Sequence, residues 1–167
     1  MVSGISADAE ADRAVRLATS PAGAVATFAP TVADNCPGAT LTCVPPSGSV
    51  FAIGDTTVHC TATDASSNQS SCSFNLHVKG AAEQTADLLA AVNSLNLSKP
   101  GVKNALLFQL NATLAGLQNR NRMAACGSLY SFIELVDAQR NKTISSSEAD
   151  LLIAAANQIR AVIGCTP

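Results

Sequence analysis

The 167-residue chain has few of the side chains on which several classes of protein depend. It contains no tryptophan and one tyrosine, and only 13% of its residues are charged. A net charge of -2 argues against nucleic acid as a partner, because binding to phosphates needs a strongly basic surface. Aromatic platforms for stacking on sugar rings are equally scarce. We therefore expect no nucleic-acid partner, and a glycan partner only through a shallow, hydrogen-bonded site.

Long apolar segments are also missing. No apolar run approaches the ~20 residues that a bilayer-spanning helix requires. The opening residues, MVSGISADAE, lack the basic and then apolar layout of a secretory signal. We expect no membrane span. If the protein is exported, its signal has been removed, or the sequence is a piece of a longer chain.

Cysteine, in contrast, is well represented. Four of the six cysteines lie in short β-prone runs separated by Pro, Gly, Ser and Asn, and two follow after a change in composition near Gly80. They are Cys36, Cys43, Cys60 and Cys72, and then Cys126 and Cys165. Such a set predicts disulfides and an oxidising, extracellular or cell-surface location. Four cysteines allow three pairings, and their spacing does not choose among them. We predict two small domains, at residues 1–80 and 81–167.

The first domain has the pattern of a β-sheet protein. Its expected strands are residues 14–19, 24–28, 40–44, 56–64 and 72–79. In the last two, small or apolar residues alternate with polar ones, which places Cys60 and Cys72 on the inward face. Leu41 and Cys43 are in the same phase. We therefore expect cysteines in the core, where oxidised pairs can join two sheets.

A family resemblance extends this interpretation. The string DNC, followed by PPSGSVFAIGDTTVHCTATDASSNQSSCSF, resembles the hyalin repeat, or HYR domain, over roughly residues 5–79. The resemblance implies an immunoglobulin-like, antiparallel β-sandwich with a bridge between Cys36 and Cys72, which leaves Cys43 and Cys60 as an extra pair. Ser67 stands where the family has glycine in its DASGN turn. We expect that turn to be of another type, or to carry backbone strain.

The second domain has a helical period of about 3.6 residues. Its apolar stripes are Leu88, Leu89, Val92 and Leu95; Val102, Leu106, Leu110, Leu114 and Leu117; Met123, Leu129, Ile133 and Val136; and Leu152, Ala155, Ile159 and Val162. Short connections predict an up-and-down four-helix bundle. Pro100 suits a first helical turn, and Ser145 with Glu148 forms a capping-box pattern. Antiparallel neighbours would bring Cys126 and Cys165 to one end, which predicts a third disulfide.

Residues 83–164 resemble the FIMAH domain, a small helical module of secreted bacterial proteins. The likeness lies in the spacing of GVKNALLFQLNATL, in FIELVDAQRNKTIS and in EADLLIAAANQI. It implies a helical architecture and a bacterial origin, but it implies no activity.

Candidate metal and catalytic residues are few. His59 and His77 share the outward phase of neighbouring strands, and one allowed register places them opposite each other, but two ligands are too few for a zinc site. Asp34, Asp55 and Asp64 flank turns, where carboxylates commonly accept from backbone N–H groups. Calcium binding by these carboxylates is the alternative, although no DxDxDG-type loop is present. No segment resembles a nucleophile elbow. We expect no enzymatic activity, no metal and no cofactor.

The expected fold is therefore α+β in two domains, and the expected function is non-catalytic. We predict an extracellular adhesion or interaction module of a secreted or cell-surface bacterial protein. Its partner would be a protein or a cell-surface component, a second copy of the chain included, recognised by strand addition at exposed sheet edges. The alternatives are a structural subunit of a self-assembling extracellular fibre and a substrate-targeting accessory region of a secreted hydrolase.

Overall fold

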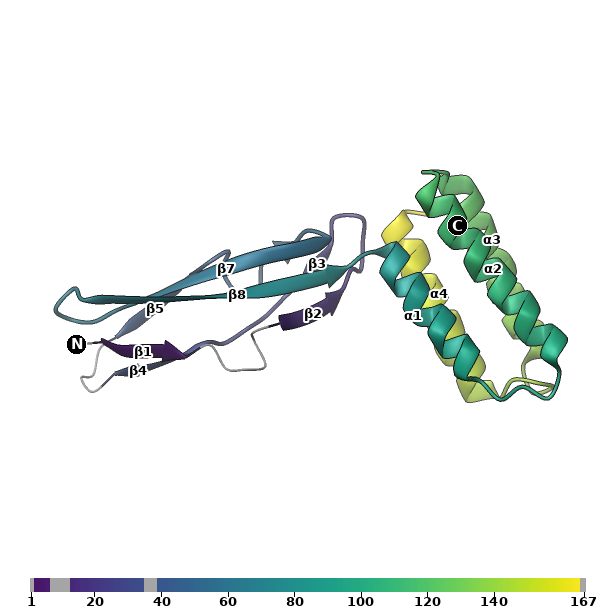
Figure 1. Cartoon of the computed structure of the whole chain (residues 1–167), viewed down its shortest axis with the longest axis horizontal. Helices are drawn as coiled ribbons and strands as arrows, with labels where there is room; N and C mark the ends of the chain where they lie inside the picture. Colours follow the sequence, from purple (N-terminus) through teal and green to yellow (C-terminus); the bar gives the residue numbers. More distant parts are fainter. Residues whose placement is uncertain (1, 7–12, 35–38, 166–167) are drawn as a thin grey trace. The chain divides into compact units, whose positions relative to one another are not determined.

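The computed structural model describes residues 2–6, 13–34 and 39–165, and it shows an α+β protein (Figure 1). The chain divides into two compact units. The first, the β unit, comprises Met1–Leu17 and Ala22–Lys79, and the second, the helical unit, comprises Ala18–Pro21 and Gly80–Pro167.

The β unit is built around a mixed four-stranded sheet with the strand order β2-β8-β7-β5. Strands β1 and β4 form a two-stranded antiparallel sheet, as do β3 and β6. The bounds are β1 Val2–Ser6, β2 Arg13–Leu17, β3 Ala24–Val25, β4 Thr31–Asp34, β5 Thr40–Val44, β6 Val50–Phe51, β7 Gly54–Thr63 and β8 Gln69–Lys79. Strand β2 runs parallel to β8, so the prediction that every pairing is antiparallel was wrong at this edge.

The β7–β8 hairpin forms the centre of this sheet. Its register runs without a break from Gly54 opposite Val78 to Thr63 opposite Gln69. The predicted alternation is confirmed from Val58 to Ala62 and from Phe74 to Val78, whereas Cys72, which was also expected in the core, is only partly buried. The buried inward residues are Val58, Cys60, Ala62, Phe74, Leu76 and Val78. The ring of Phe28 packs edge-on against Phe74 at 5.0 Å and Phe51 at 6.2 Å between centroids, which completes an aromatic centre for the core.

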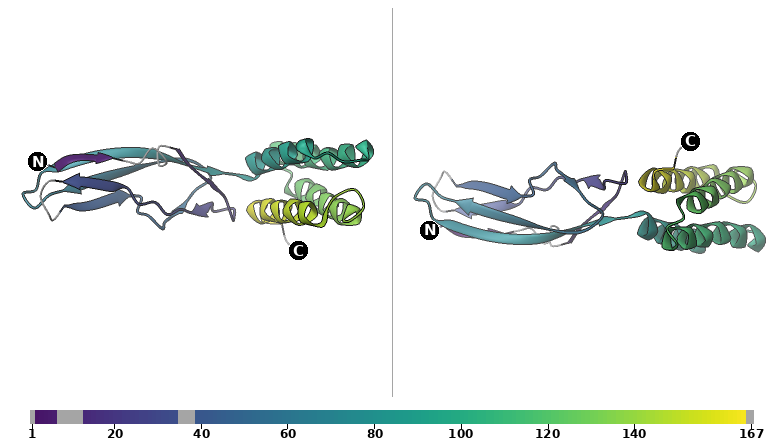
Figure 2. Two further views of the ribbon diagram at one scale, coloured as in Figure 1. Left: turned by 90° about the horizontal axis from the view of Figure 1, so that it is seen from below. Right: turned by 90° about the horizontal axis from the view of Figure 1, so that it is seen from above.

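In the described part of the helical unit there are four helices, each packed against two others. They are α1 Ala81–Ser94, α2 Pro100–Gln118, α3 Arg122–Gln139 and α4 Ser146–Ile163. Helices α1 and α3 both contact α2 and α4, and Figure 2 shows the helices lying side by side. The largest fully buried side chains between them include Leu106, Leu110, Leu129, Phe132 and Ile159.

The predicted helix starts are confirmed. Pro100 is the first residue of α2, where its missing N–H leaves no hydrogen bond unmade. The Ser145 hydroxyl accepts from the backbone N–H of Glu148 at 3.3 Å, while the Glu148 carboxylate accepts from the N–H of Ser145 at 3.1 Å. The hydrogen bond from the Ser145 side chain, followed by that from its backbone, lowers the pKa of Glu148.

One predicted core residue is exposed instead. Met123 is 84% accessible to solvent, whereas Ala125 is fully buried. A Cβ atom at position 116 would meet the backbone N of Ala125 at 2.8 Å, so α2 and α3 approach closely where Gly116 faces Ala125. Met123 lies in the first turn of α3, outside that contact. The close approach therefore uses small residues, to which an apolar-stripe pattern gives little weight.

Four residues from the N-terminal half of the sequence belong to the helical unit. The carbonyl of Ala18 accepts from the side-chain amide of Gln84 in α1 at 3.0 Å and from that of Gln158 in α4 at 3.2 Å. Ala18 is fully buried, and Gln84 is 6% exposed. In the predicted division of the chain at residue 80, residues 18–21 fall in the first domain. A single backbone carbonyl that serves two glutamines leaves no trace in periodicity or composition.

The two interior helical glycines provide a first prediction. Replacement of Gly116 with alanine should destabilise the protein by about 1–3 kcal/mol, because the new methyl group would overlap the α3 backbone. Gly127→Ala in α3 is the matched control, since nothing lies within 4 Å of its added methyl group. It should stabilise by up to about 1 kcal/mol, the difference in helix propensity. Urea unfolding of both variants measures this, and equal effects would contradict the close approach.

Candidate binding edge of the sheet

Strand β5 lies at one edge of the central sheet, and its one strand partner in the described part of the chain is β7. Its sequence, TLTCV, contains no charged residue and no proline. Exposed edges are usually blocked by charge, proline or a bulge, because their unpaired N–H and C=O groups are a template for another strand. The β5 edge carries none of these protections.

The register determines which backbone groups face outward. Cys43 lies opposite Cys60 with a Cα–Cα distance of 4.0 Å. Such short separations mark the non-hydrogen-bonded pairs of an antiparallel ladder, in which both residues turn their N–H and C=O groups away from each other. Leu41, two residues before Cys43, lies opposite Ala62 in a pair of the same non-hydrogen-bonded type. Two N–H donors and two C=O acceptors, from Leu41 and Cys43, therefore point away from β7 along the edge.

An open hollow of about 460 Å³ lies beside this edge. It is lined by Phe28, Ala29, Pro30, Leu41, Thr42, Cys43, Pro46 and Ser47. The far wall is held in place by hydrogen bonds, since the Phe28 N–H donates to the Ser47 hydroxyl at 2.9 Å and the Gly48 N–H donates to the Ala26 carbonyl at 2.8 Å. About half of the exposed lining of the hollow is apolar, and none of its residues is charged, so it suits uncharged side chains.

The cysteines of the β unit lie in a row across the sheet. Cys43 and Cys60 form a disulfide. Cys72 lies opposite Cys60 on the other side, in β8, and it has no disulfide to any cysteine in the described segments. The predicted partner of Cys72, Cys36, falls outside the described residues, so this pairing stays a prediction.

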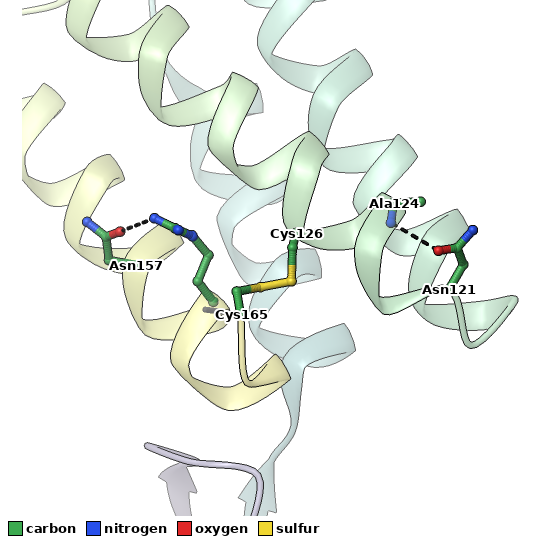
Figure 3. Close-up of a disulfide and its surroundings, with 6 residues drawn as sticks. Asn121, Ala124, Cys126, Asn157 and Cys165 are labelled. Carbon is green, nitrogen blue, oxygen red and sulfur yellow. Dashed lines mark hydrogen bonds between the residues drawn. A yellow bond between two sulfur atoms is a disulfide. The ribbon is translucent and has the colours of Figure 1, made fainter. Parts of the chain in front are cut away.

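In the helical unit, a disulfide joins Cys126 in α3 to Cys165, which follows the end of α4 (Figure 3). The same end of α3 is capped by Asn121, whose side-chain oxygen accepts from the N–H of Ala124 at 3.0 Å. The bridge and the cap both fix the first turn of α3.

The two histidines do not face each other. His59 lies opposite Ser73, and His77 lies opposite Asp55. Nδ1 of His77 is 2.8 Å from Oδ1 of Asp55, so this pair links the two central strands on the outward face. Nowhere in residues 2–6, 13–34 and 39–165 do three His, Cys, Asp or Glu side chains gather as a metal site would require.

Asp64 has the predicted role in a turn. Its Oδ1 accepts from the N–H groups of Ser66 and Asn68 at 2.9 and 2.8 Å, and its Oδ2 accepts from the Asn68 side chain at 2.8 Å. The side-chain hydrogen bond from Asn68, with smaller effects from the two backbone N–H groups, lowers the pKa of Asp64. Both carboxylate oxygens are thus used by the turn itself.

Arg140 organises the connection between α3 and α4, and the sequence analysis missed it. Its guanidinium contacts Oδ1 of Asp150 at 2.6 Å and Oδ1 of Asp137 at 2.9 Å. These hydrogen bonds, that to Asp150 first, raise the pKa of Arg140. Arg140 therefore pairs with one carboxylate from each helix, Asp137 in α3 and Asp150 in α4.

Comparison with known proteins found a match of one segment of the chain to a family. Residues 10–78 match the HYR domain, which is less than half of the chain. No curated protein and no solved structure matches the chain. HYR domains are non-enzymatic, adhesion-type extracellular modules. This match and the two disulfides indicate an extracellular protein with a protein or surface partner. The FIMAH resemblance stays a prediction.

Among the helices in the described residues, none combines the length and the apolar character needed to cross a bilayer.

The turn that follows β7 provides a second prediction. Ser67 adopts φ = 67°, a left-handed conformation that favours glycine, as its position in the HYR-like pattern suggested. Ser67→Gly should stabilise the protein by about 1 kcal/mol by removing that strain. Ser66→Gly is the matched control, because Ser66 has no positive φ and the change should be neutral or slightly destabilising. Thermal unfolding of both variants tests this, and an equal response at the two positions would show that Ser67 is unstrained.

Proposed function

We propose that the protein is a non-catalytic extracellular interaction module whose β unit binds an extended segment of a partner protein by strand addition at β5. The observation that carries this proposal is the pair of outward-facing residues, Leu41 and Cys43, on an edge that has no charge or proline. A partner strand that pairs with β5 would satisfy two N–H and two C=O groups at once.

The hollow would supply the specificity. Backbone hydrogen bonds contribute only about 0.5–1.5 kcal/mol each, so two to four of them give weak binding that is nearly independent of sequence. Alternate side chains of an added strand point to the same face, and every second one would reach the hollow beside Phe28 and Pro46. Because its lining carries no charge, we expect uncharged side chains at those positions and little dependence of binding on salt.

The finer architecture belongs to the same proposal. We infer that the β unit is an immunoglobulin-like sandwich, that the four helices form a FIMAH-like bundle, and that the two are separate domains of a secreted bacterial protein. The alternating burial in β7 and β8 supports the sandwich. The contacts of both α1 and α3 with α2 and α4 support the bundle.

Self-assembly into a fibre is a second candidate function, favoured by one observation. An antiparallel pairing of two β5 strands around Thr42 would place Leu41 of each copy opposite Cys43 of the other, so that all the outward groups are satisfied. Multi-angle light scattering over a range of concentrations distinguishes self-assembly from a module that binds another protein. A monomer at the highest concentration contradicts the fibre.

A third prediction tests the edge directly. The N–H of Leu41 points away from β7, so Leu41→Pro should remove an outward donor and leave the β5–β7 ladder intact. Leu41→Ala is the control that shortens the side chain but keeps the donor. Peptides selected from a phage-displayed library of decapeptides on the wild-type protein should bind Leu41→Pro about 5- to 150-fold more weakly, the effect of leaving one acceptor unpaired.

For Leu41→Ala the loss should be smaller, because only an apolar contact is reduced. Circular dichroism checks that both variants are folded. Selected peptides that bind Leu41→Pro as well as wild type, or a library that yields no binder, would contradict strand addition at β5.

A further inference from the structure

The outward face of strands β5, β7 and β8, which lie side by side in Figure 1, is an ordered array of small polar side chains. The register places Thr42 of β5 opposite Thr61 of β7, and Thr61 opposite Ser71 of β8, so the three form one row across the strands. Further polar side chains lie in the same phase in the rows on either side. We call this array the hydroxyl face, and it comprises Thr40, Thr42, Thr61, Thr63, Gln69, Ser71 and Ser73.

The hydroxyl face is accessible to a partner. Its members on β5 and β8 are exposed, and the two on β7, which lie between them, are half-buried. The Thr40 hydroxyl donates to the Thr63 carbonyl at 3.4 Å, and its oxygen keeps the capacity to accept. Each serine or threonine hydroxyl provides one donor and two acceptor sites. The face therefore presents both donors and acceptors on its surface.

The sheet gives these groups a regular spacing. Alternate side chains along a strand are about 6.7 Å apart, and directly opposed positions on neighbouring strands are about 4.8 Å apart. Most members of the face are threonines, whose β-branched side chains have few rotamers. Holding such a side chain against a ligand therefore loses little conformational entropy. The hydroxyl face is a preformed grid, suited to a partner whose own hydrogen-bonding groups repeat.

The composition of the face indicates the chemistry of that partner. No Asp, Glu, Lys or Arg lies in the outward phase of β5, of β7 from Thr57 to Thr63, or of β8 from Gln69 to Asn75. The face therefore offers no counter-charge to an ionic partner. Aromatic and large apolar side chains, which form the cores of protein interfaces, are also missing from it. Sugar hydroxyls donate and accept as threonine and serine hydroxyls do, so an uncharged sugar polymer is the complementary partner.

We propose that the hydroxyl face is a docking surface for the ordered surface of an insoluble, uncharged polysaccharide. Each hydrogen bond to a sugar replaces one to water, so its net contribution is small. A single sugar unit reaches too few of the side chains for stable binding, whereas polymer chains held side by side in a solid meet several rows at once. The groups that bind are side chains on the face of the sheet, so this docking does not involve strand addition at the β5 edge.

Sedimentation of the full chain with microcrystalline cellulose, chitin and starch granules tests the proposal. We expect retention on at least one of these solids. Retention should persist up to about 1 M sodium chloride, because no charged group takes part. A soluble oligosaccharide of the same linkage should release the protein from the solid, and the corresponding monosaccharide should not.

Two substitutions in the central row identify the surface. Thr42→Val and Thr61→Val each remove a hydroxyl and keep a β-branched side chain of the same shape, which suits a strand. Each should weaken retention by about 2- to 12-fold, the effect of one lost hydrogen bond, and the double variant should weaken it further. Thr27→Val is the matched control, because Thr27 is an exposed threonine outside these three strands, and it should bind as wild type does. Circular dichroism checks that all the variants are folded.

Three outcomes would overturn the proposal. The first is a wild-type protein that none of the three solids retains. The second is a double variant that binds as well as wild type or better, which would indicate apolar adsorption. The third is a loss of retention in Leu41→Pro as large as in the double variant, which would place the binding at the β5 edge. Leu41→Pro that loses peptide binding but is still retained on the solid shows that the two surfaces act separately.

Discussion

The register of the β7–β8 hairpin is the constraint on which the rest of the β unit depends. Ten successive residue pairs hold the two strands together, and every inward position from Val58 to Ala62 and from Phe74 to Val78 is buried. A slip of one residue would turn all of these side chains to solvent, so the hydrophobic core and the register stabilise each other. Because β5 and β2 are added to opposite sides of this pair, the hairpin also decides which backbone groups remain at each edge.

Much of this arrangement could be predicted from the sequence, because it rests on strong periodicity. The alternation in residues 56–64 and 72–79 and the four helical stripes identified the two longest strands and all the helices. Strand 40–44 was also predicted at its observed bounds. Each of these elements buries one face, and the regular spacing of apolar residues in the sequence predicts such a face.

Other features were missed, each for a physical reason. Strand β6 has two residues, too few for any period to appear, and β3 comprises only the first two residues of the predicted strand 24–28. The parallel pairing of β2 with β8 depends on chain topology rather than on composition. The candidate edge was only partly predictable. Its cysteines were recognised, but which N–H groups face outward follows from a register that places Cys43 opposite Cys60. His59 and His77 could not be placed for the same reason.

The composition of the helical unit has a consequence for how this protein can be divided. The chain passes from one unit to the other between Leu17 and Ala18, between Pro21 and Ala22, and between Lys79 and Gly80. A cut at residue 80 would therefore leave residues 18–21 of the helical unit on the other piece. The C-terminal fragment would lose the carbonyl that accepts from Gln84 and Gln158, and with it two hydrogen bonds of the helical unit. A fragment that keeps the helical unit whole has to carry residues 18–21 as well as the helices.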